Sequence, residues 1–147
     1  VFSRQNTSPI SRTPDQIEGI SNGGYLLKEH SEAQLTLVGS GSEVQLILDA
    51  ADILEEAGVI ANVVSMPCLD IFLESEESYQ LSVIKNDLPI LAVELGHPNS
   101  WYKLLNKEDK VLGIDSFGES APANVLLEHF GFSTSNVVKM AKTLINA

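Results

Sequence analysis

The fold is decided by one stretch of the sequence, Leu35-Thr36-Leu37-Val38-Gly39-Ser40-Gly41-Ser42-Glu43-Val44. Its first residues form a short apolar run that a glycine ends, which is typical of a buried strand. Apolar residues then recur at helical spacing as far as Ala57, so a helix is expected after a tight glycine turn. Ser40 stands three residues before Glu43, which is the spacing of a capping box, and we expect it to cap that helix.

The rest of the chain continues this alternation of strand and helix. Further strands are expected at residues 25–28, 61–65, 88–94 and 110–114. Helices are expected at residues 14–20, 74–84, 122–130 and 135–145, with short turns or helical pieces at 68–72 and 101–105. Thr13 and Ser120 are the expected N-caps of the helices at 14–20 and 122–130.

The lengths of the connections predict the strand directions. Parallel neighbours need a connection of about a dozen residues, and the polar link between Lys28 and Leu35 is shorter. The first strand is therefore expected to run antiparallel to the second. The later connections contain helices, and right-handed crossovers place such helices on both faces of a sheet. The sequence thus predicts an α/β fold, a three-layer α/β/α sandwich around a five-stranded, mostly parallel mixed sheet whose first strand is antiparallel.

Composition narrows the class of protein. The chain has 147 residues, of which 44% are hydrophobic, and this is enough for one domain with its own core. A net charge of −11 disfavours binding to nucleic acid or to an anionic membrane surface. The single Cys68 indicates a reducing compartment, so a cytoplasmic location is expected. Residues 1–22 are polar, lack a starting methionine and resemble a linker from a longer protein, so we expect them to pack poorly.

Motifs that carry chemistry are scarce. The glycine turn resembles the start of a dinucleotide fingerprint, but Val44 occupies the position of the third glycine, which disfavours NAD. Ser40, Gly41 and Ser42 remain a candidate anion-binding turn, because a helix N-terminus presents free amides. His97 follows a strand near Glu94 without forming a recognisable catalytic set, and no histidine has metal-ligand spacing. From the residues alone we expect no catalytic residue and no metal site.

A set of ordered motifs identifies a resemblance. The chain is similar over nearly its whole length to the carboxy-terminal third of the transketolases, through the stretches Ser3-Arg4-Gln5-Asn6, Gly23-Gly24-Tyr25, Gly39-Ser40-Gly41-Ser42-Glu43-Val44, Val64-Ser65-Met66-Pro67, Trp101-Tyr102-Lys103, Phe117-Gly118-Glu119-Ser120-Ala121-Pro122 and Phe130-Gly131-Phe132-Ser133. Each motif is weak by itself, and their shared order makes the resemblance specific.

The resemblance implies a function for a longer parent protein. Transketolases transfer a two-carbon ketol group between ketose and aldose phosphates, with thiamine diphosphate and Mg²⁺ or Ca²⁺, and work as homodimers in the pentose phosphate pathway or in carbon fixation. It implies that residues 1–22 are the tail of a preceding pyrimidine-binding domain with its linker, and that residues 23–147 are a non-catalytic C-terminal domain. The family's Gly-Asp-Gly metal motif is absent from this sequence. The fragment itself is therefore expected to bind no cofactor and to be inactive.

Residue Arg4 matches the family arginine that binds the substrate phosphate, and guanidinium suits that task because it can bind phosphate oxygens bidentately. The expected partners are the rest of the parent chain, its homodimer mate and, for the intact enzyme, sugar phosphates. Two alternatives remain open: a regulatory module for a small anion or nucleotide, and a domain that only supports a dimer. The same fold occurs in other thiamine-dependent enzymes, namely the beta subunits of 2-oxo-acid dehydrogenases and the deoxyxylulose phosphate synthases.

Overall fold

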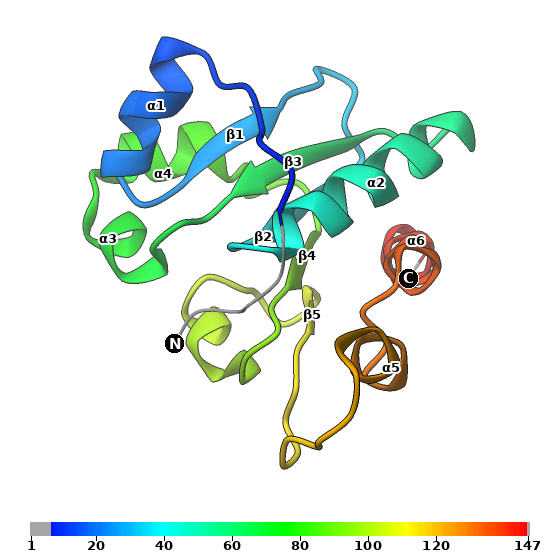
Figure 1. Ribbon diagram of the computed structural model, residues 1–147. Coiled ribbons are helices and arrows are strands. Elements are labelled where there is room, and N and C mark those ends of the chain that lie inside the picture. The colour runs from blue at the N-terminus through cyan, green and yellow to red at the C-terminus, as the bar shows by residue number, and fades with distance from the viewer. Residues whose placement is uncertain (1–6, 147) are drawn as a thin grey trace.

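The computed structural model describes residues 7–146, and Figure 1 shows their arrangement. The strands are β1 (Tyr25–Lys28), β2 (Leu35–Gly39), β3 (Ala61–Ser65), β4 (Ile90–Val93) and β5 (Lys110–Leu112). The helices are α1 (Pro14–Ser21), α2 (Glu43–Glu56), α3 (Leu69–Glu74), α4 (Glu77–Val83), α5 (Ala123–His129) and α6 (Thr134–Ile145), with the 3₁₀ helix η1 (Pro98–Lys103). In the described part of the chain, no helix has the length and apolar character needed to cross a membrane.

The strands form one five-stranded sheet in the order β1-β3-β2-β4-β5. Strand β1 pairs antiparallel with β3, and all the other neighbours are parallel. In the central strand, Leu37 is in register with Val63 on one side and Leu91 on the other. The mixed sheet with an antiparallel first strand is confirmed, and β2 lies in its middle, as a run buried on both faces predicts.

Helices cover both faces of the sheet, which confirms the three layers. On one face, Leu37, Val63 and Leu91 pack with Ile47 of α2 and Val137 of α6. Helices α2 and α6 lie side by side on this face (Figure 1). On the other face, Val38, Val64 and Ala92 pack with Phe72 of α3 and Trp101 of η1.

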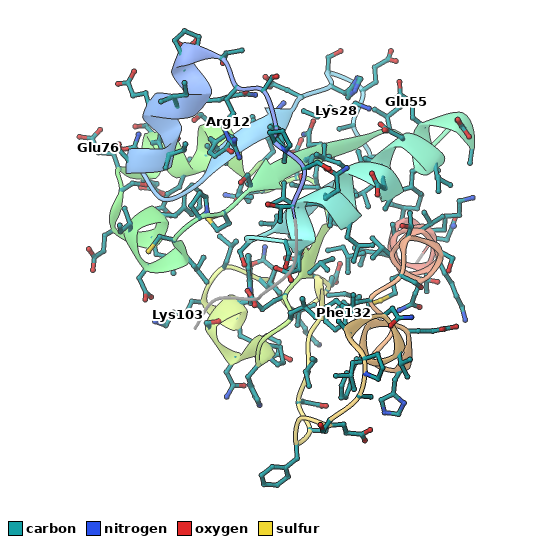
Figure 2. All side chains as sticks on the ribbon, in the orientation of Figure 1. Arg12, Lys28, Glu55, Glu76, Lys103 and Phe132 are labelled. Carbon is teal, nitrogen blue, oxygen red and sulfur yellow. The ribbon has the colours of Figure 1, made fainter. Side chains whose placement is uncertain are left out.

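The segment before β1 forms hydrogen bonds to the sheet. Thr13 and Gln16 form a complete capping box at the start of α1, which confirms Thr13 as the N-cap. The Gln16 amide nitrogen also donates to the backbone carbonyls of Leu26 at 3.0 Å and Leu27 at 3.1 Å. Arg12 donates from Nε to the Tyr25 hydroxyl, and it is labelled in Figure 2. Hydrogen bonds thus hold α1 at the edge of the sheet, although most of its side chains are exposed, and poor packing before Asn22 stays a prediction.

The expected helical piece at residues 68–72 is helix α3, and the expected helix at 74–84 is α4, which begins three residues later than expected. Helix α3 ends at Glu74 and α4 begins at Glu77, and the two residues between them, Ser75 and Glu76, have extended backbone angles, with ψ of 167° and 140°. The Gln80 side chain donates to the carbonyls of Leu73 and Ser75, which satisfies acceptors that the break leaves open. The sequence places the start of the second helix too early, because the acidic residues Glu74 and Glu76 suit a helix start as well as the break before it.

The carboxy-terminal helices begin at other residues than expected. Helix α5 follows Pro122 as its N-cap residue, without a side-chain cap, so Ser120 does not cap it. Helix α6 begins at Thr134, where the Ser133 hydroxyl accepts from the Asn136 amide. Strands β4 and β5 are shorter than the ranges 88–94 and 110–114.

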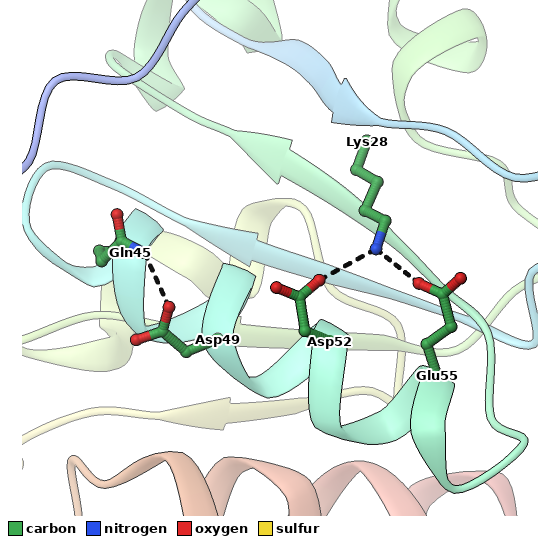
Figure 3. A network of polar contacts seen from close by, with 5 residues as sticks. All are labelled: Lys28, Gln45, Asp49, Asp52 and Glu55. Atoms are coloured by element: carbon green, nitrogen blue, oxygen red, sulfur yellow. Dashed lines mark hydrogen bonds and ion pairs between the residues drawn. The ribbon is translucent and has the colours of Figure 1, made fainter.

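Strand β1 is also tied to helix α2 by charge. Lys28 places its ammonium 3.1 Å from Asp52 and 2.6 Å from Glu55, both on α2 (Figure 3). The carboxylates are one helical turn apart, so one lysine can reach both.

Candidate functional site

The most suggestive position in this fold is the point where the chain changes direction across the sheet. After β2 the chain enters α2 and returns to β3, whereas after β4 it enters η1 and goes on to β5 on the opposite side. Helix α2 and η1 pack on opposite faces. Open α/β sheets bind ligands at such a switch point, beyond the carboxyl ends of the strands. The residues that follow β2 and β4 are therefore the candidate site.

Glu94, directly after β4, is the centre of this site. Its carboxylate accepts from the Ser40 hydroxyl at 2.9 Å, from the Gly96 amide at 2.9 Å and from the Trp101 indole at 3.3 Å. Glu94 is half-buried, and Trp101 is only 2% exposed. The Glu94 carboxylate thus connects the loop after β2 to η1, and its oxygens accept hydrogen bonds from groups of the same domain.

Glu43 adds a second carboxyl group at the same edge. It is the first residue of α2, is only 5% exposed and accepts from the Ser42 hydroxyl at 2.9 Å. Burial raises the pKa of the Glu43 carboxyl above its usual value, and the negative charge of Glu94 adds to this rise. The site therefore holds one hydrogen-bonded carboxylate and, beside it, one carboxyl group that its surroundings hold toward the neutral form.

Glycines let the turn approach this helix closely. A Cβ on Gly39 would lie 3.1 Å from the Ile47 side chain and 3.4 Å from the backbone of Glu43. Gly41 has a φ of +52°, a left-handed conformation that side chains disfavour. The two glycines of the motif thus serve local packing and the turn.

The predicted capping box is wrong. The Ser40 hydroxyl donates to Glu94, and Ser42 occupies the N-cap position without a side-chain cap. The Glu43 carboxylate receives the Ser42 hydroxyl instead of the amide of a cap residue. Sequence spacing could not reveal this, because the competing acceptor, Glu94, lies 54 positions away in the chain.

The same geometry disfavours the candidate anion turn. The hydroxyls of Ser40 and Ser42 both donate to carboxylates, and Gly41 lies between them. A phosphate at this turn would meet two carboxyl groups and would compete for hydroxyls that already donate. The turn is thus a poor place for an anion, even though it opens a helix.

The remaining candidates lie apart from this site. The His97 ring nitrogen Nδ1 accepts from the Asn99 amide at 3.3 Å, so His97 begins η1 as a cap. His129 lies 3.6 Å from Glu119 at the surface, and Cys68 is a free, half-buried thiol. Within residues 7–146, no group of three or more potential ligands could hold a metal ion. Arg4 lies outside the described residues.

Glu94 and Trp101 are the functional-site residues that sequence reasoning underestimated. The sequence marks Glu94 only as a neighbour of His97, and Trp101 only as part of a short helical piece and of one resemblance motif. Their common signal is position in the chain: Glu94 directly follows the parallel strand β4, and Trp101 lies in η1, the element that comes next, so both reach the switch point.

Comparisons with known proteins agree with the fold. The family model of the transketolase-like C-terminal domain matches residues 23–133. Transketolase 1 of Pasteurella multocida is 40% identical over 150 residues, an alignment that covers 99% of this chain. The transketolase from Leishmania mexicana superposes with a TM-score of 0.88 at 36% identity, over 97% of this chain and 20% of its own. A transketolase from Pichia stipitis, solved as a complex with sedoheptulose 7-phosphate, superposes with a TM-score of 0.82 at 35% identity, over 88% of this chain and 19% of its own.

These matches cover this chain almost completely and their own chains only in part. The chain spans 22% of the length of the Pasteurella protein. The ordered motifs, the five-stranded mixed sheet and the family model all indicate one assignment. The chain belongs to the transketolase-like C-terminal domain family.

Proposed function

We propose that residues 23–147 are the non-catalytic C-terminal domain of a transketolase, and that residues 1–22 are the end of the preceding pyrimidine-binding domain with its linker. The observation that supports this most strongly is the combination of a match over 99% of this chain with only 22% of the relative's length. A domain of a larger enzyme accounts for both values. The catalytic groups then belong to the remainder of the parent protein.

The parent enzyme transfers a two-carbon ketol group from a ketose phosphate to an aldose phosphate in the cytoplasm, as part of the pentose phosphate pathway. Its partners are a second copy of itself, as a homodimer, and its sugar phosphate substrates. The ketose phosphate in the Pichia stipitis structure supports this class of substrate. Thiamine diphosphate supplies the chemistry of carbon–carbon bond cleavage when it is bound, together with Mg²⁺ or Ca²⁺.

The residues of this chain do not fit that cofactor. The sequence lacks the Gly-Asp-Gly motif, and the described residues contain no ligand cluster for a divalent metal. The carboxylate of Glu94 accepts from three donors of its own domain, which leaves it committed to structure. Cofactor and metal are therefore assigned to the rest of the parent chain.

Arg4 is the substrate-binding residue in this proposal. In the parent it binds the phosphate of the substrate through its guanidinium group, which offers paired N–H donors to phosphate oxygens. It stands upstream of α1, and Arg12 and Gln16 hold the start of that helix to the edge of the sheet.

The test compares the 147-residue chain with the full-length gene product. We expect the full-length protein to transfer ketol groups between sugar phosphates, and the chain alone neither to do so nor to bind thiamine diphosphate in the presence of Mg²⁺. In the full-length protein, Arg4→Gln is expected to raise KM about tenfold or more, since it removes a charge-assisted bond to phosphate. Lys139→Gln on the exposed side of α6 is the matched control. Transfer by the chain alone, or none by the full-length protein, would overturn the proposal.

A further inference from the structure

The segment between β5 and the middle of α5 stands out from the domain. Every residue from 115 to 125 is exposed, and Phe117 is 97% exposed. Helix α5 contains no buried residue, and its Val125 is 50% exposed. In Figure 1 this segment extends away from the body of the molecule. We call residues 115–125 the projecting segment.

Packing among the described residues explains neither Phe117 nor Gly118, although Glu119 of the same segment lies 3.6 Å from His129 of α5. A Cβ on Gly118 would meet no atom within 4 Å, and its φ is outside the left-handed region, so neither crowding nor backbone strain requires glycine there. Phe117 makes almost no use of its apolar surface in this chain. Yet both belong to the ordered motif Phe117 to Pro122 that identifies the family. A surface that approaches from outside would explain a large apolar side chain next to a residue without one.

Charge decides which surface that is. The aromatic ring stands between two acidic residues, Asp115 and Glu119, so its binding site needs an apolar pocket with a neutral or basic rim. A second copy of this chain carries a net charge of −11 and would bring acidic groups against acidic groups. A longer parent, by contrast, supplies a different surface on the same polypeptide. This chain spans only 22% of the length of one relative, so most of such a parent lies outside it.

We propose that the projecting segment docks onto the part of the parent polypeptide that precedes this chain, with Phe117 as the anchor in an apolar pocket. This rests on the proposed function, because it needs the longer parent. An aromatic side chain suits the role, since it buries much apolar area while losing little rotamer freedom. The exposed loop thereby joins the C-terminal domain to the rest of the enzyme.

The experiment measures amide hydrogen exchange of residues 113–126 in the 147-residue chain and in the full-length protein. Docking is expected to slow exchange there by about tenfold or more in the full-length protein, whereas the core strand β2 exchanges slowly in both. Equal exchange of the segment in the two proteins would overturn the proposal. Concentration-dependent dimerisation of the chain alone, with the same protection, would overturn it in favour of a second copy.

A pair of variants separates docking from folding. Phe117→Ala is expected to leave the thermal transition of the 147-residue chain unchanged, because the ring is exposed, and to return the exchange of the segment in the full-length protein to the fast rate. Ile53→Ala is the matched control, since Ile53 is an exposed apolar residue, at 46%, on α2. If both variants leave the protection intact, Phe117 is not the anchor and the proposal fails. The readout needs no substrate, so it does not depend on whether the parent transfers ketol groups.

Discussion

The two edges of the sheet differ in how the chain completes them. At the β1 edge, helix α1 lies alongside the strand, and Gln16 donates to the carbonyls of Leu26 and Leu27. At the other edge, β5 has only three residues and leads into the exposed projecting segment. Free strand edges attract other chains, so proteins cover or shorten them. The molecule therefore covers one edge with its own helix and shortens the other, next to the surface that we assign to a partner.

The β5 edge is stabilised by packing against Trp101 of η1. This residue is 2% exposed, packs in the cluster that includes Val111 of β5, and donates to Glu94. Trp101→Ala is expected to lower the free energy of unfolding by about 3–5 kcal/mol, through the loss of packing and the cavity it leaves. Urea unfolding of the chain measures this. Tyr102→Ala, at the exposed neighbour, is the control and is expected to change stability by no more than about 0.5 kcal/mol. Equal losses for the two variants would show that η1 does not support β5.

The β1 edge is expected to depend on Gln16. Gln16→Ala removes two hydrogen bonds to strand carbonyls and half of the capping box at Thr13, so we expect a loss of about 1–2 kcal/mol. Faster amide exchange in β1 than in β2 would locate the effect at the edge. Gln45→Ala is the matched control, because the Gln45 amide donates to Asp49 within α2, on an exposed surface (Figure 3). A uniform change across all strands would contradict the comparison of the two edges.

The sequence predicts the layers of this fold well, for a local reason. Strand β2 is a continuous apolar run and α2 has a regular apolar stripe, so each signal lies within a few neighbouring residues. The short link between Lys28 and Leu35 also correctly predicts the direction of β1. Strand order could not be predicted in this way. Strand β3 lies between β1 and β2, and no residue in the link between β1 and β2 indicates this.

The candidate site shows where local reasoning ends. Ser40 fits a capping box by spacing, yet its hydroxyl donates to Glu94, which another strand delivers to the same place. Gln16 has the spacing of a capping-box residue and does form the box with Thr13, while its side-chain amide nitrogen also donates to a carbonyl of β1. Polar side chains at strand ends therefore find partners that depend on strand order, which these residues by themselves do not specify.

Glu43 provides a test at the centre of the sheet, between the two edges. Its pKa is raised by burial, so the folded chain holds a proton at pH values where the unfolded chain has already lost it, above about 4.3. The contribution of Glu43 to stability therefore falls as the pH rises through this window, and stays reduced above the folded pKa. At neutral pH, the Glu43→Gln variant is expected to be more stable than the unsubstituted chain. The gain in free energy of unfolding should be smaller than the loss expected for Gln16→Ala, and it should vanish near pH 4. Melting temperatures across this range test it, with the exposed Glu56→Gln as the control. A Glu43→Gln variant that is less stable at neutral pH would contradict it.

The smallest effect is expected at Lys28, which joins β1 to α2 by charge. The hydrogen bond from Lys28 lowers the pKa of Glu55, and the same bond raises the pKa of Lys28 against the opposing effect of its partial burial. The lysine contribution is thus present below its unfolded pKa and lost as the pH rises through the folded pKa, while the Glu55 contribution is lost as the pH falls through its own lowered pKa. All three side chains are partly exposed, so solvent weakens these pairs.

Lys28→Met is therefore expected to lower the melting temperature at neutral pH by only about 1 °C, and by less as salt is added, because ions screen exposed pairs. Lys107→Met, in the exposed loop before β5, is the matched change near the other edge and is expected to leave both the melting temperature and its salt dependence unaltered. If the two lysine variants behaved alike, the charges on α2 would add nothing to the hold on β1. The β1 edge would then be held from the N-terminal side, by the Gln16 amide of α1 and by the Arg12 guanidinium just before that helix.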